Sequence, residues 1–273
     1  MAKEYAFQGF SILLPDDSML GVYQQRHPKY DRFLPHLAKF LQPGDTVIDV
    51  GANVGDTLAG MAQYNARLHY LCVEPQGSFY SLLLQNIQRI SSAHPGLVAL
   101  PVQSLVGLGV SGVALEGQFG TSHAVAVASG GMQSETLDSI VARHPALPPV
   151  RLLKSDVDGF DYDVLASATR ILQNDAPLVF FECQYENDAQ KAGFEALFPL
   201  LQAQGYTDWT LFDNFGEVMV RTGDLKTIAS MLQYVWRQNM HGATRTIYYY
   251  DVLCARPSDS AWIDRVLASY HAH

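Results

Sequence analysis

Cysteine is scarce in this chain. The 273 residues include three cysteines, Cys72, Cys183 and Cys254, and none belongs to a CxxC pair or to a Cys/His ligand spacing. An odd number of widely separated cysteines disfavours a disulfide framework and a structural zinc site. All three lie in apolar runs, so we expect small, reduced core residues and a cytoplasmic location.

Long apolar runs and an excess of positive charge are also absent. No uninterrupted apolar stretch reaches the ~18 residues that a membrane span needs. The N-terminal sequence MAKEYAFQGF lacks the apolar segment of a signal peptide. With 18 basic and 27 acidic residues, the formal net charge is −9. Because nucleic-acid binding depends on clustered Lys and Arg, this balance argues against a nucleic-acid partner.

Apolar residues make up 48% of the chain, which is typical of a globular protein. From residue 41 onward strand-like and helix-like stretches alternate, which predicts βαβ units and a mostly parallel sheet. The expected strands are 46–50, 69–73, 97–102, 150–154, 177–182, 207–212 and 246–255. The expected helices are 56–64, 78–90, 135–143, 161–172, 194–204 and 225–239.

Two stretches fall outside this alternation. Residues 105–128 mix Gly and Ser with apolar residues, which predicts short antiparallel strands. Residues 1–40 precede the first expected strand and are predicted to form an N-terminal cap or lid. We expect residues 41–273 to form one domain with an insertion near 213–245.

The sharpest motif is TVIDVGANVGDTL, residues 46–58, in which a strand runs into a glycine-containing turn and then a helix. Gly51 and Gly55 allow a sharp turn and close approach of a ligand, and the helix N-terminus presents unpaired N–H groups. Glu74 ends the second expected strand, 23 residues after Gly51. An acidic residue at that spacing accepts hydrogen bonds from ribose hydroxyls. The pattern predicts a nucleoside-containing cofactor.

The missing middle glycine bears on which cofactor this is. The dinucleotide fingerprint G-x-G-x-x-G needs a glycine where this chain has Asn53, so a pyrophosphate is disfavoured. Asp49 adds a carboxylate where a cationic ammonium group would sit. S-adenosylmethionine has ribose hydroxyls, an ammonium and a sulfonium but no phosphate, and fits better. A nucleotide-cofactor oxidoreductase is the less favoured alternative.

The segments VIDVGANVGDT, CVEP, ETLDSIV and LLKSDVDGFDYDVL resemble the FkbM-type family of S-adenosylmethionine-dependent methyltransferases. The resemblance covers roughly residues 24–182 and extends more loosely to residue 255. It implies the class I methyltransferase fold, a Rossmann-like, doubly wound α/β fold. Its seven-stranded sheet is mostly parallel, with an antiparallel last strand. It also implies O-methylation of a hydroxyl on a sugar, a glycan or a glycosylated natural product, with another small molecule as the alternative acceptor.

The resemblance also assigns residues to the cofactor, with S-adenosylhomocysteine as its product. The implied cofactor-binding residues are Asp49, Gly51, Ala52, Asn53, Gly55, Asp56, Thr57, Glu74, Pro75, Gln103, Ser104 and Asp156. Asp158 departs from the family pattern, which more often has Glu there.

An alcohol must lose its proton when it is methylated, and the candidate bases at strand ends are Asp156, Asp158 and Glu182. Capping of the following helix is an equally good explanation for Asp158. The three carboxylates are compatible with Mg²⁺, although metal dependence is not favoured.

Four further residues are candidates for the acceptor site. His27 and Tyr30 belong to the N-terminal cap, which we expect to close over the cofactor, and Asp213 and Asn214 follow the sixth strand. For the first pair, ordinary packing is favoured over a catalytic role and the lid is favoured for binding. For the second pair, the alternative is a turn, where Asp and Asn are common.

Two rival functions and the oligomeric state stay open at this point. A nucleic-acid methyltransferase is disfavoured because LPPV, residues 147–150, is not the acidic/Asn-Pro-Pro-aromatic motif used for exocyclic amines. A non-catalytic scaffold is disfavoured because Asp49, Glu74 and Asp156 are all present. The expected partner is a small-molecule or glycan acceptor, and a homo-oligomer is left open.

Overall fold

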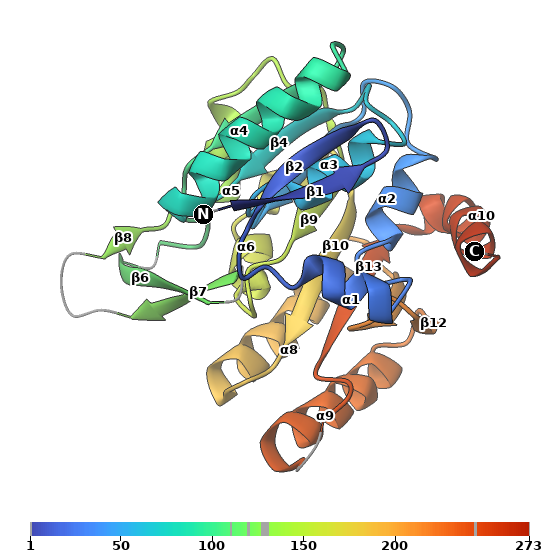
Figure 1. Ribbon diagram of the computed structural model, residues 1–273. Helices are drawn as coiled ribbons and strands as arrows, with labels where there is room; N and C mark the ends of the chain where they lie inside the picture. Colours follow the sequence, from blue (N-terminus) through green and yellow to red (C-terminus); the bar gives the residue numbers. More distant parts are fainter. Residues whose placement is uncertain (1, 110, 119–120, 127–130, 243–244, 273) are drawn as a thin grey trace.

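The centre of the computed structural model is a mixed eight-stranded sheet (Figure 1). The structure describes residues 2–109, 111–118, 121–126, 131–242 and 245–272. Its strand order is β12-β11-β13-β10-β9-β3-β4-β5. The bounds are β3 (Thr46–Val50), β4 (His69–Val73), β5 (Val98–Val102), β9 (Val150–Ser155), β10 (Leu178–Gln184), β11 (Asp208–Asp213), β12 (Val218–Thr222) and β13 (Tyr249–Ala255).

The pairing of these strands gives the class I methyltransferase fold. Strands β5, β4, β3, β9 and β10 are parallel neighbours, and β13 runs antiparallel between β10 and β11. The mostly parallel sheet with an antiparallel last strand is confirmed. The prediction of seven strands is wrong by one, because the chain turns back after β11 and adds β12 at the edge. Strand β12 lies in the stretch that the sequence suggested was an insertion.

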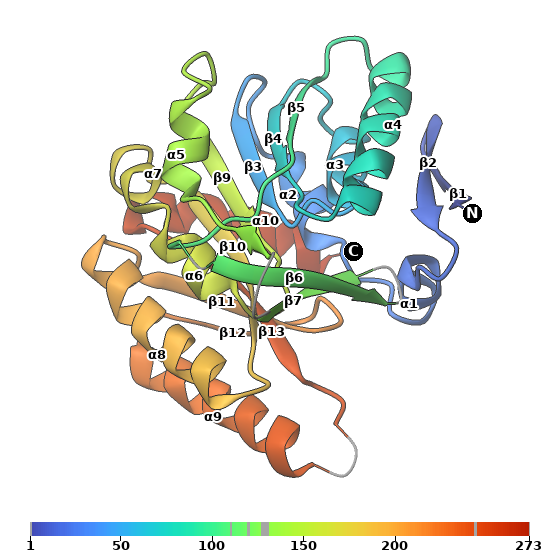
Figure 2. The same ribbon diagram turned by 90° about the vertical axis from the view of Figure 1, so that its left-hand side faces the viewer.

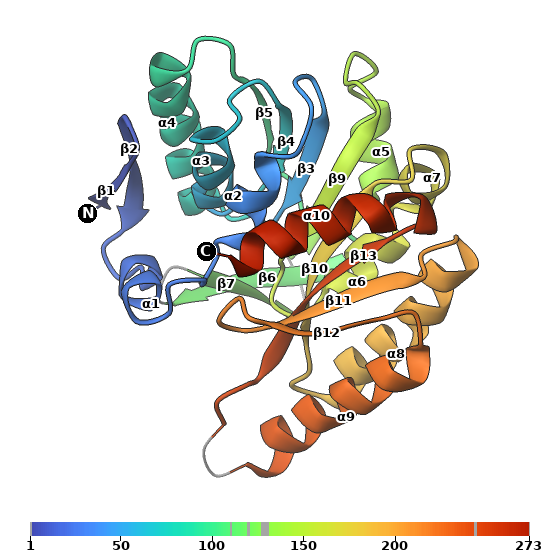
Figure 3. The same ribbon diagram turned by 90° about the vertical axis from the view of Figure 1, so that its right-hand side faces the viewer.

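Helices cover both faces of the sheet (Figures 2 and 3). One face packs against α2 (Phe33–Ala38), α3 (Asp56–Ala62), α4 (Gly77–Ala93) and α10 (Ser260–His271). The other packs against α5 (Leu137–Ala142), α6 (Asp161–Ala166), α7 (Thr169–Asn174), α8 (Asp188–Ala203) and α9 (Leu225–His241). Side chains alternate between the two faces along a strand, so Val47 joins the first core and Ile48 the second. The central strands are therefore buried on both faces and mainly apolar.

The N-terminal residues form a hairpin and two short helices. Strands β1 (Ala2–Phe7) and β2 (Phe10–Pro15) pair with each other and lie beside α4. There Asn86 donates to the Leu13 carbonyl and accepts from the Leu13 amide. Helix α1 (Leu20–Arg26) follows, and α2 is buried along its whole length. Residues 33–38 are thus part of the main core rather than an appendage.

The Gly- and Ser-containing segment forms a separate small sheet. Strands β6 (Ser111–Gln118), β7 (Thr121–Ala126) and β8 (Met132–Gln133) pair antiparallel in the order β7-β6-β8. Short antiparallel strands were predicted for residues 105–128, where β6 and β7 lie. Residues 110, 119–120 and 127–130 of this stretch, and 243–244 of the expected insertion, lie outside the described residues. Within the described part of the chain, no helix is long and apolar enough to cross a membrane.

Candidate active site

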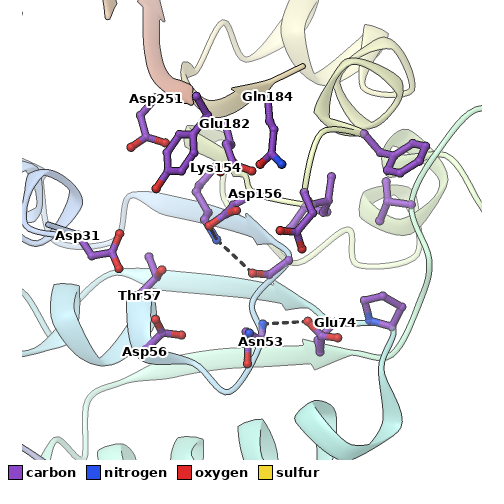
Figure 4. Close-up of a pocket in the computed structure, with 18 of the residues that line it drawn as sticks. Asp31, Asn53, Asp56, Thr57, Glu74, Lys154, Asp156, Glu182, Gln184 and Asp251 are labelled. Atoms are coloured by element: carbon purple, nitrogen blue, oxygen red, sulfur yellow. Dashed lines mark hydrogen bonds and ion pairs between the residues drawn. The ribbon is translucent and has the colours of Figure 1, made fainter. Parts of the chain in front are cut away.

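A cavity of about 460 Å³ opens at the carboxyl ends of the parallel strands (Figure 4). Its wall is formed by the segments that follow β3, β4, β5 and β9, by the end of β10 and by the start of β13. The N-terminal segment contributes Ser18, Met19, Leu20, Tyr23, Tyr30 and Asp31. Because parallel strands all end at this edge, side chains far apart in sequence meet here.

The turn after β3 is shaped by two glycines. Gly51 and Gly55 have φ angles of +73° and +85°, which an L-residue with a side chain rarely adopts. A Cβ atom on Gly51 would lie 1.9 Å from the backbone oxygen of Asp156, and one on Gly55 would lie 2.9 Å from the Leu83 side chain. The close approach that requires glycine at position 51 is therefore to the segment after β9.

Glu74 is fixed at the end of β4 by two backbone amides. Its Oε2 accepts from the Asn53 amide at 2.9 Å, and its Oε1 accepts from the Gln76 amide at 2.7 Å. The residue is 3% exposed and lines the cavity. Burial raises its pKa to about 7, although the two amides act to lower it. Each oxygen keeps a second lone pair with which to accept a hydroxyl proton from a ligand.

Lys154, which sequence reasoning missed, ties β9 to β3 beneath the cavity. Its Nζ lies 2.9 Å from Asp49 Oδ1 and 3.4 Å from Asp156 Oδ2, and donates to the Gly51 carbonyl at 3.1 Å. The side chain is 5% exposed. Burial acts to lower the pKa of Lys154, but Asp49 and Asp156 outweigh it and hold the pKa above its ordinary value. The signal that could have revealed it is a lysine in the mainly apolar strand VRLLK, residues 150–154.

Carboxylates gather at the opposite end of the cavity from Glu74. Glu182 on β10 is paired in register with Asp251 on β13, and Asp31 approaches from the N-terminal segment (Figure 4). Burial, reinforced by Asp156, raises the pKa of Glu182 and of Asp251 well above the usual range. Burial likewise raises the pKa of Asp31 to about 7. Asp251 was missed as well, although it is an acid inside the apolar run YYYDVLCA.

Unusual backbone conformations cluster around the same cavity. Among the described residues, four that are not glycine have positive φ angles, and three of them, Asp31, Asn53 and Asp158, line the cavity. Such conformations are held by their surroundings and concentrate at functional sites. Asp158 has a φ of 51°, and burial, with Asp156 next, raises its pKa to about 7. The N-cap residue of helix α6 is Phe160, so Asp158 is not the N-cap residue of that helix.

Most of the predicted site residues meet at this cavity. Those that line it are Tyr30, Gly51, Asn53, Asp56, Thr57, Glu74, Pro75, Ser104, Asp156, Asp158 and Glu182. The predicted residues outside its wall are His27, Asp49, Ala52, Gly55, Gln103, Asp213 and Asn214.

The residues outside the wall have other partners. Asp49 is 1% exposed and faces Lys154, which takes the place expected for a ligand's ammonium. The His27 ring stacks on Phe215 with 3.9 Å between centroids. Asp213 accepts the amides of Phe215 and Glu217 in the turn after β11, and Asn214 accepts the Tyr248 amide. Asp213 and Asn214 therefore stabilise a turn, and neither residue lines the cavity.

No group of three or more His, Cys, Asp or Glu side chains within the described ranges is arranged to hold a metal ion. The side chains of Asp156, Asp158 and Glu182 share the cavity without forming such a group.

Comparison with known proteins gives one family match. Residues 49–207 match the family model described as the methyltransferase FkbM domain. No curated protein matches the chain.

Several solved structures are similar in fold. Methyltransferase FkbM from Methylobacillus flagellatus KT is 13% identical, covering 69% of this chain and 54% of that one, with a TM-score of 0.43. An O-methyltransferase from Bacillus cereus in complex with SAH is 12% identical, covering 87% and 88%, with a TM-score of 0.49. The Methanococcus jannaschii fibrillarin pre-rRNA processing protein is 8% identical, covering 93% and 82%, with a TM-score of 0.45.

Proposed function

The chain belongs to the methyltransferase FkbM family, and from that membership we propose that it methylates a hydroxyl of a sugar, a glycan or a glycosylated natural product. S-Adenosylmethionine is the cofactor of this family and S-adenosylhomocysteine the product. The enzyme is a methyltransferase, so the oxidoreductase alternative is set aside. The observation that carries the hydroxyl assignment is the set of carboxylates that line the cavity, because an ionised carboxylate accepts a hydrogen bond from a hydroxyl group.

The residues present fit S-adenosylmethionine. The volume of about 460 Å³ is that of a site for a small molecule. Glu74 offers two fixed oxygens for a pair of ribose hydroxyls. The described wall holds one cation, Lys154, which is already paired with Asp49, so a phosphate would lack a counter-charge there. An acidic wall instead suits the sulfonium of this cofactor.

Cofactor binding is assigned to the residues at the ends of β3, β4, β5 and β9. Glu74 and Pro75 hold the ribose and the adenine edge, and Ser104 lies on the adenine side. Gly51, Asn53, Asp56, Thr57 and Asp156 surround the methionine part. Asp49 acts from beneath, by fixing Lys154 and through it Asp156.

Proton transfer is assigned to Asp158. When bound, S-adenosylmethionine supplies the methyl group: the acceptor's O–C bond forms as the S–C bond breaks, the electron pair stays on sulfur and the hydroxyl proton goes to a carboxylate. A general base works best when its pKa lies near the working pH, and that of Asp158 is about 7. Asp156, in contact with Lys154, orients the site, and Glu182 lies deeper on the acceptor side.

The N-terminal segment is proposed to act as the lid. Tyr23 and Tyr30 line the cavity, and their rings lie 5.1 Å apart between centroids. These rings exclude water from the reacting groups. His27, stacked on Phe215, holds the segment rather than touching the acceptor.

Mass spectrometry of reaction mixtures tests the acceptor class. The protein is incubated with S-adenosylmethionine and a panel of sugars, with and without EDTA. We expect a product heavier by one methylene unit, with the methyl group on oxygen, and no effect of EDTA. Absence of any oxygen-methylated product across the panel would overturn the assignment, and loss of product with EDTA would restore a metal.

We expect Glu74→Gln to weaken S-adenosylhomocysteine binding roughly 10- to 100-fold, because one accepting oxygen becomes a donor and a charge-assisted hydrogen bond is worth about 1.5–3 kcal/mol. The change keeps the shape of the side chain. Calorimetric titration measures the affinity, and Glu195→Gln, an exposed residue of α8, is the matched control. Equal affinities for Glu74→Gln and the unaltered protein would remove Glu74 from the site.

A further inference from the structure

The cavity wall carries more carboxyl groups than the positive charge of one cofactor molecule can stabilise in ionised form. The described lining residues include eight carboxylates, Asp31, Asp56, Glu74, Asp156, Asp158, Asp163, Glu182 and Asp251, and one cation, Lys154. Lys154 is already balanced by Asp49, which lies outside the wall. S-Adenosylmethionine brings an ammonium, a carboxylate and a sulfonium, a net charge of one. Glu182 and Asp251, on the acceptor side, are therefore left with no unpaired cation in the described wall to stabilise their ionised form, and burial raises the pKa of both.

Glu182 is the one of these eight carboxylates with a buried oxygen that has no hydrogen-bond partner among the described residues. The residue is 7% exposed, and the oxygen is Oε2. The side chain lines the cavity beside Asp251, its register partner on β13 (Figure 4). A buried carboxylate oxygen without a partner is costly, so a donor supplied by the ligand would be strongly favoured here.

The surroundings of Glu182 indicate what kind of donor fits. Asp251 and Asp31 line the same cavity, and Lys154 is the one described Lys or Arg in its wall. Arg32 acts on Asp31 from outside that wall and acts to lower its pKa. Hydroxyl donors satisfy hydrogen bonds but do not stabilise the ionised form of Glu182 or Asp251, whose pKa burial raises. An ammonium group supplies three donors and a positive charge at once.

We propose that the acceptor carries a protonated amine, which Glu182 and Asp251 bind while a hydroxyl of the same molecule faces Asp158. This inference rests on the proposed O-methylation and narrows the acceptor to an amine-bearing hydroxylated compound, such as an amino sugar. Acceptors with a carboxylate in place of the amine would be excluded by like charge. Glu182 and Asp251 are then specificity residues, and Asp158 keeps the proton transfer.

Calorimetric binding to the protein saturated with S-adenosylhomocysteine tests the inference without turnover. The probes are glucosamine, N-acetylglucosamine and glucuronate, which differ in charge on a common sugar. We expect glucosamine to bind roughly tenfold or more tightly than N-acetylglucosamine, since hydrogen bonds to charged groups are worth about 1.5–3 kcal/mol, and glucuronate not to bind. Equal binding of the first two, or no binding of glucosamine, would overturn it.

Variants test whether Glu182 causes the preference for glucosamine over N-acetylglucosamine. Glu182→Gln should reduce the ratio of the two affinities to about threefold or less, since the charge is lost and a hydrogen-bonding shape is kept. Glu186→Gln is the matched control, because Glu186 lies outside the cavity wall and should leave the ratio unchanged. If Glu182→Gln does not fold, as judged by circular dichroism, Asp251→Asn takes its place. A ratio that survives whichever variant is measured would overturn the inference.

Three further readouts separate this inference from the proposed function and from a metal site. Methylation of a hydroxyl with no preference between amine and acetamide would overturn the inference alone. A methyl group found on the nitrogen of glucosamine would overturn both the inference and O-methylation, because the inference places the amine at Glu182 and Asp251 and the hydroxyl at the reacting centre. Titration with MgCl₂ alone is the third arm, and magnesium binding lost in Glu182→Gln would overturn the inference in favour of a metal.

Discussion

Asp158→Asn should lower kcat by roughly 100- to 10,000-fold, the usual contribution of a positioned general base. Asparagine has nearly the same shape as aspartate but cannot take up the hydroxyl proton. The cofactor contacts assigned to Glu74 and Asn53 are made by other segments. Asp158 is assigned no contact with the cofactor, so binding of S-adenosylhomocysteine should change by about fivefold at most, which corresponds to about 1 kcal/mol.

The dependence of the rate on pH gives a second measurement of the same group. A base acts in its ionised form, and the pKa of Asp158 is about 7, so kcat should rise as the pH increases through about 7 and level off above it. In Asp158→Asn that rise should disappear. Asp158→Glu, the residue more often found in the family, should restore a large part of the rate because it restores the carboxylate.

Asp156→Asn distinguishes the two neighbouring carboxylates. Asp156 is in contact with Lys154, and its loss should lower turnover by disturbing the site while the rise of kcat with pH persists. Full activity of Asp158→Asn, with the pH-dependent rise lost in Asp156→Asn instead, would transfer the role of base to Asp156.

The strands nearest the site are the part of the fold that local sequence predicts best. β3 and β4 were expected at 46–50 and 69–73 and are found at those bounds, because each is a continuous apolar run ended by a turn. Helix α8 was expected from residue 194 and begins at Asp188. Its first turn is stabilised by Asn187, whose side chain accepts the Gln190 amide, and the polar residues there hid the helical pattern.

The hairpin of β1 and β2 and the edge strand β12 were not predicted for a different reason. Neither hairpin strand joins the main sheet, and the hairpin is held through Asn86 of α4, far along the chain. Strand β12 depends on pairing with β11. Long-range contacts of this kind leave no local period in the sequence.

The site shows the same division. Glu74 and Asn53 follow strand ends within one βαβ unit, so spacing alone predicted that they lie together, and they are hydrogen-bonded. Lys154 was missed because its partner is set by the order of strands: β9 lies beside β3, and Lys154 is the register partner of Asp49. The same is true of Asp251, which meets the predicted residue Glu182 only because β13 inserts beside β10.

Lys154→Met should destabilise the protein by roughly 3–5 kcal/mol, the usual result of removing one partner from a buried ion pair. Methionine keeps most of the volume, so the loss is mainly electrostatic. Asp49 is 1% exposed and would be left with no cation to stabilise its ionised form. Urea unfolding measures the change, and Lys191→Met, which removes an exposed pair with Glu195, should cost less than about 1 kcal/mol.

The pH dependence of that loss identifies Asp49 as its cause. Burial raises the pKa of Asp49 to about 6 even with Lys154 opposing it, and without the lysine the pKa rises further. A carboxyl whose pKa is raised by folding binds a proton more tightly in the folded state, so its destabilising effect is small at low pH. That effect grows as the pH rises above the unfolded pKa of about 4. The penalty in Lys154→Met should therefore be larger at pH 8 than at pH 5.

A compensating variant decides whether the ion pair or the packing matters. Adding Asp49→Asn to Lys154→Met removes the uncompensated charge, and we expect it to recover at least about half of the lost free energy at pH 8. It should recover little at pH 5, where Asp49 already carries a proton. No recovery at either pH, or a single variant no less stable than Lys191→Met, would mean that Lys154 does not hold β3 and β9 together through its charge. If the single variant does not fold, the double variant alone gives the comparison, because a folded double variant requires that the buried charge was the obstacle.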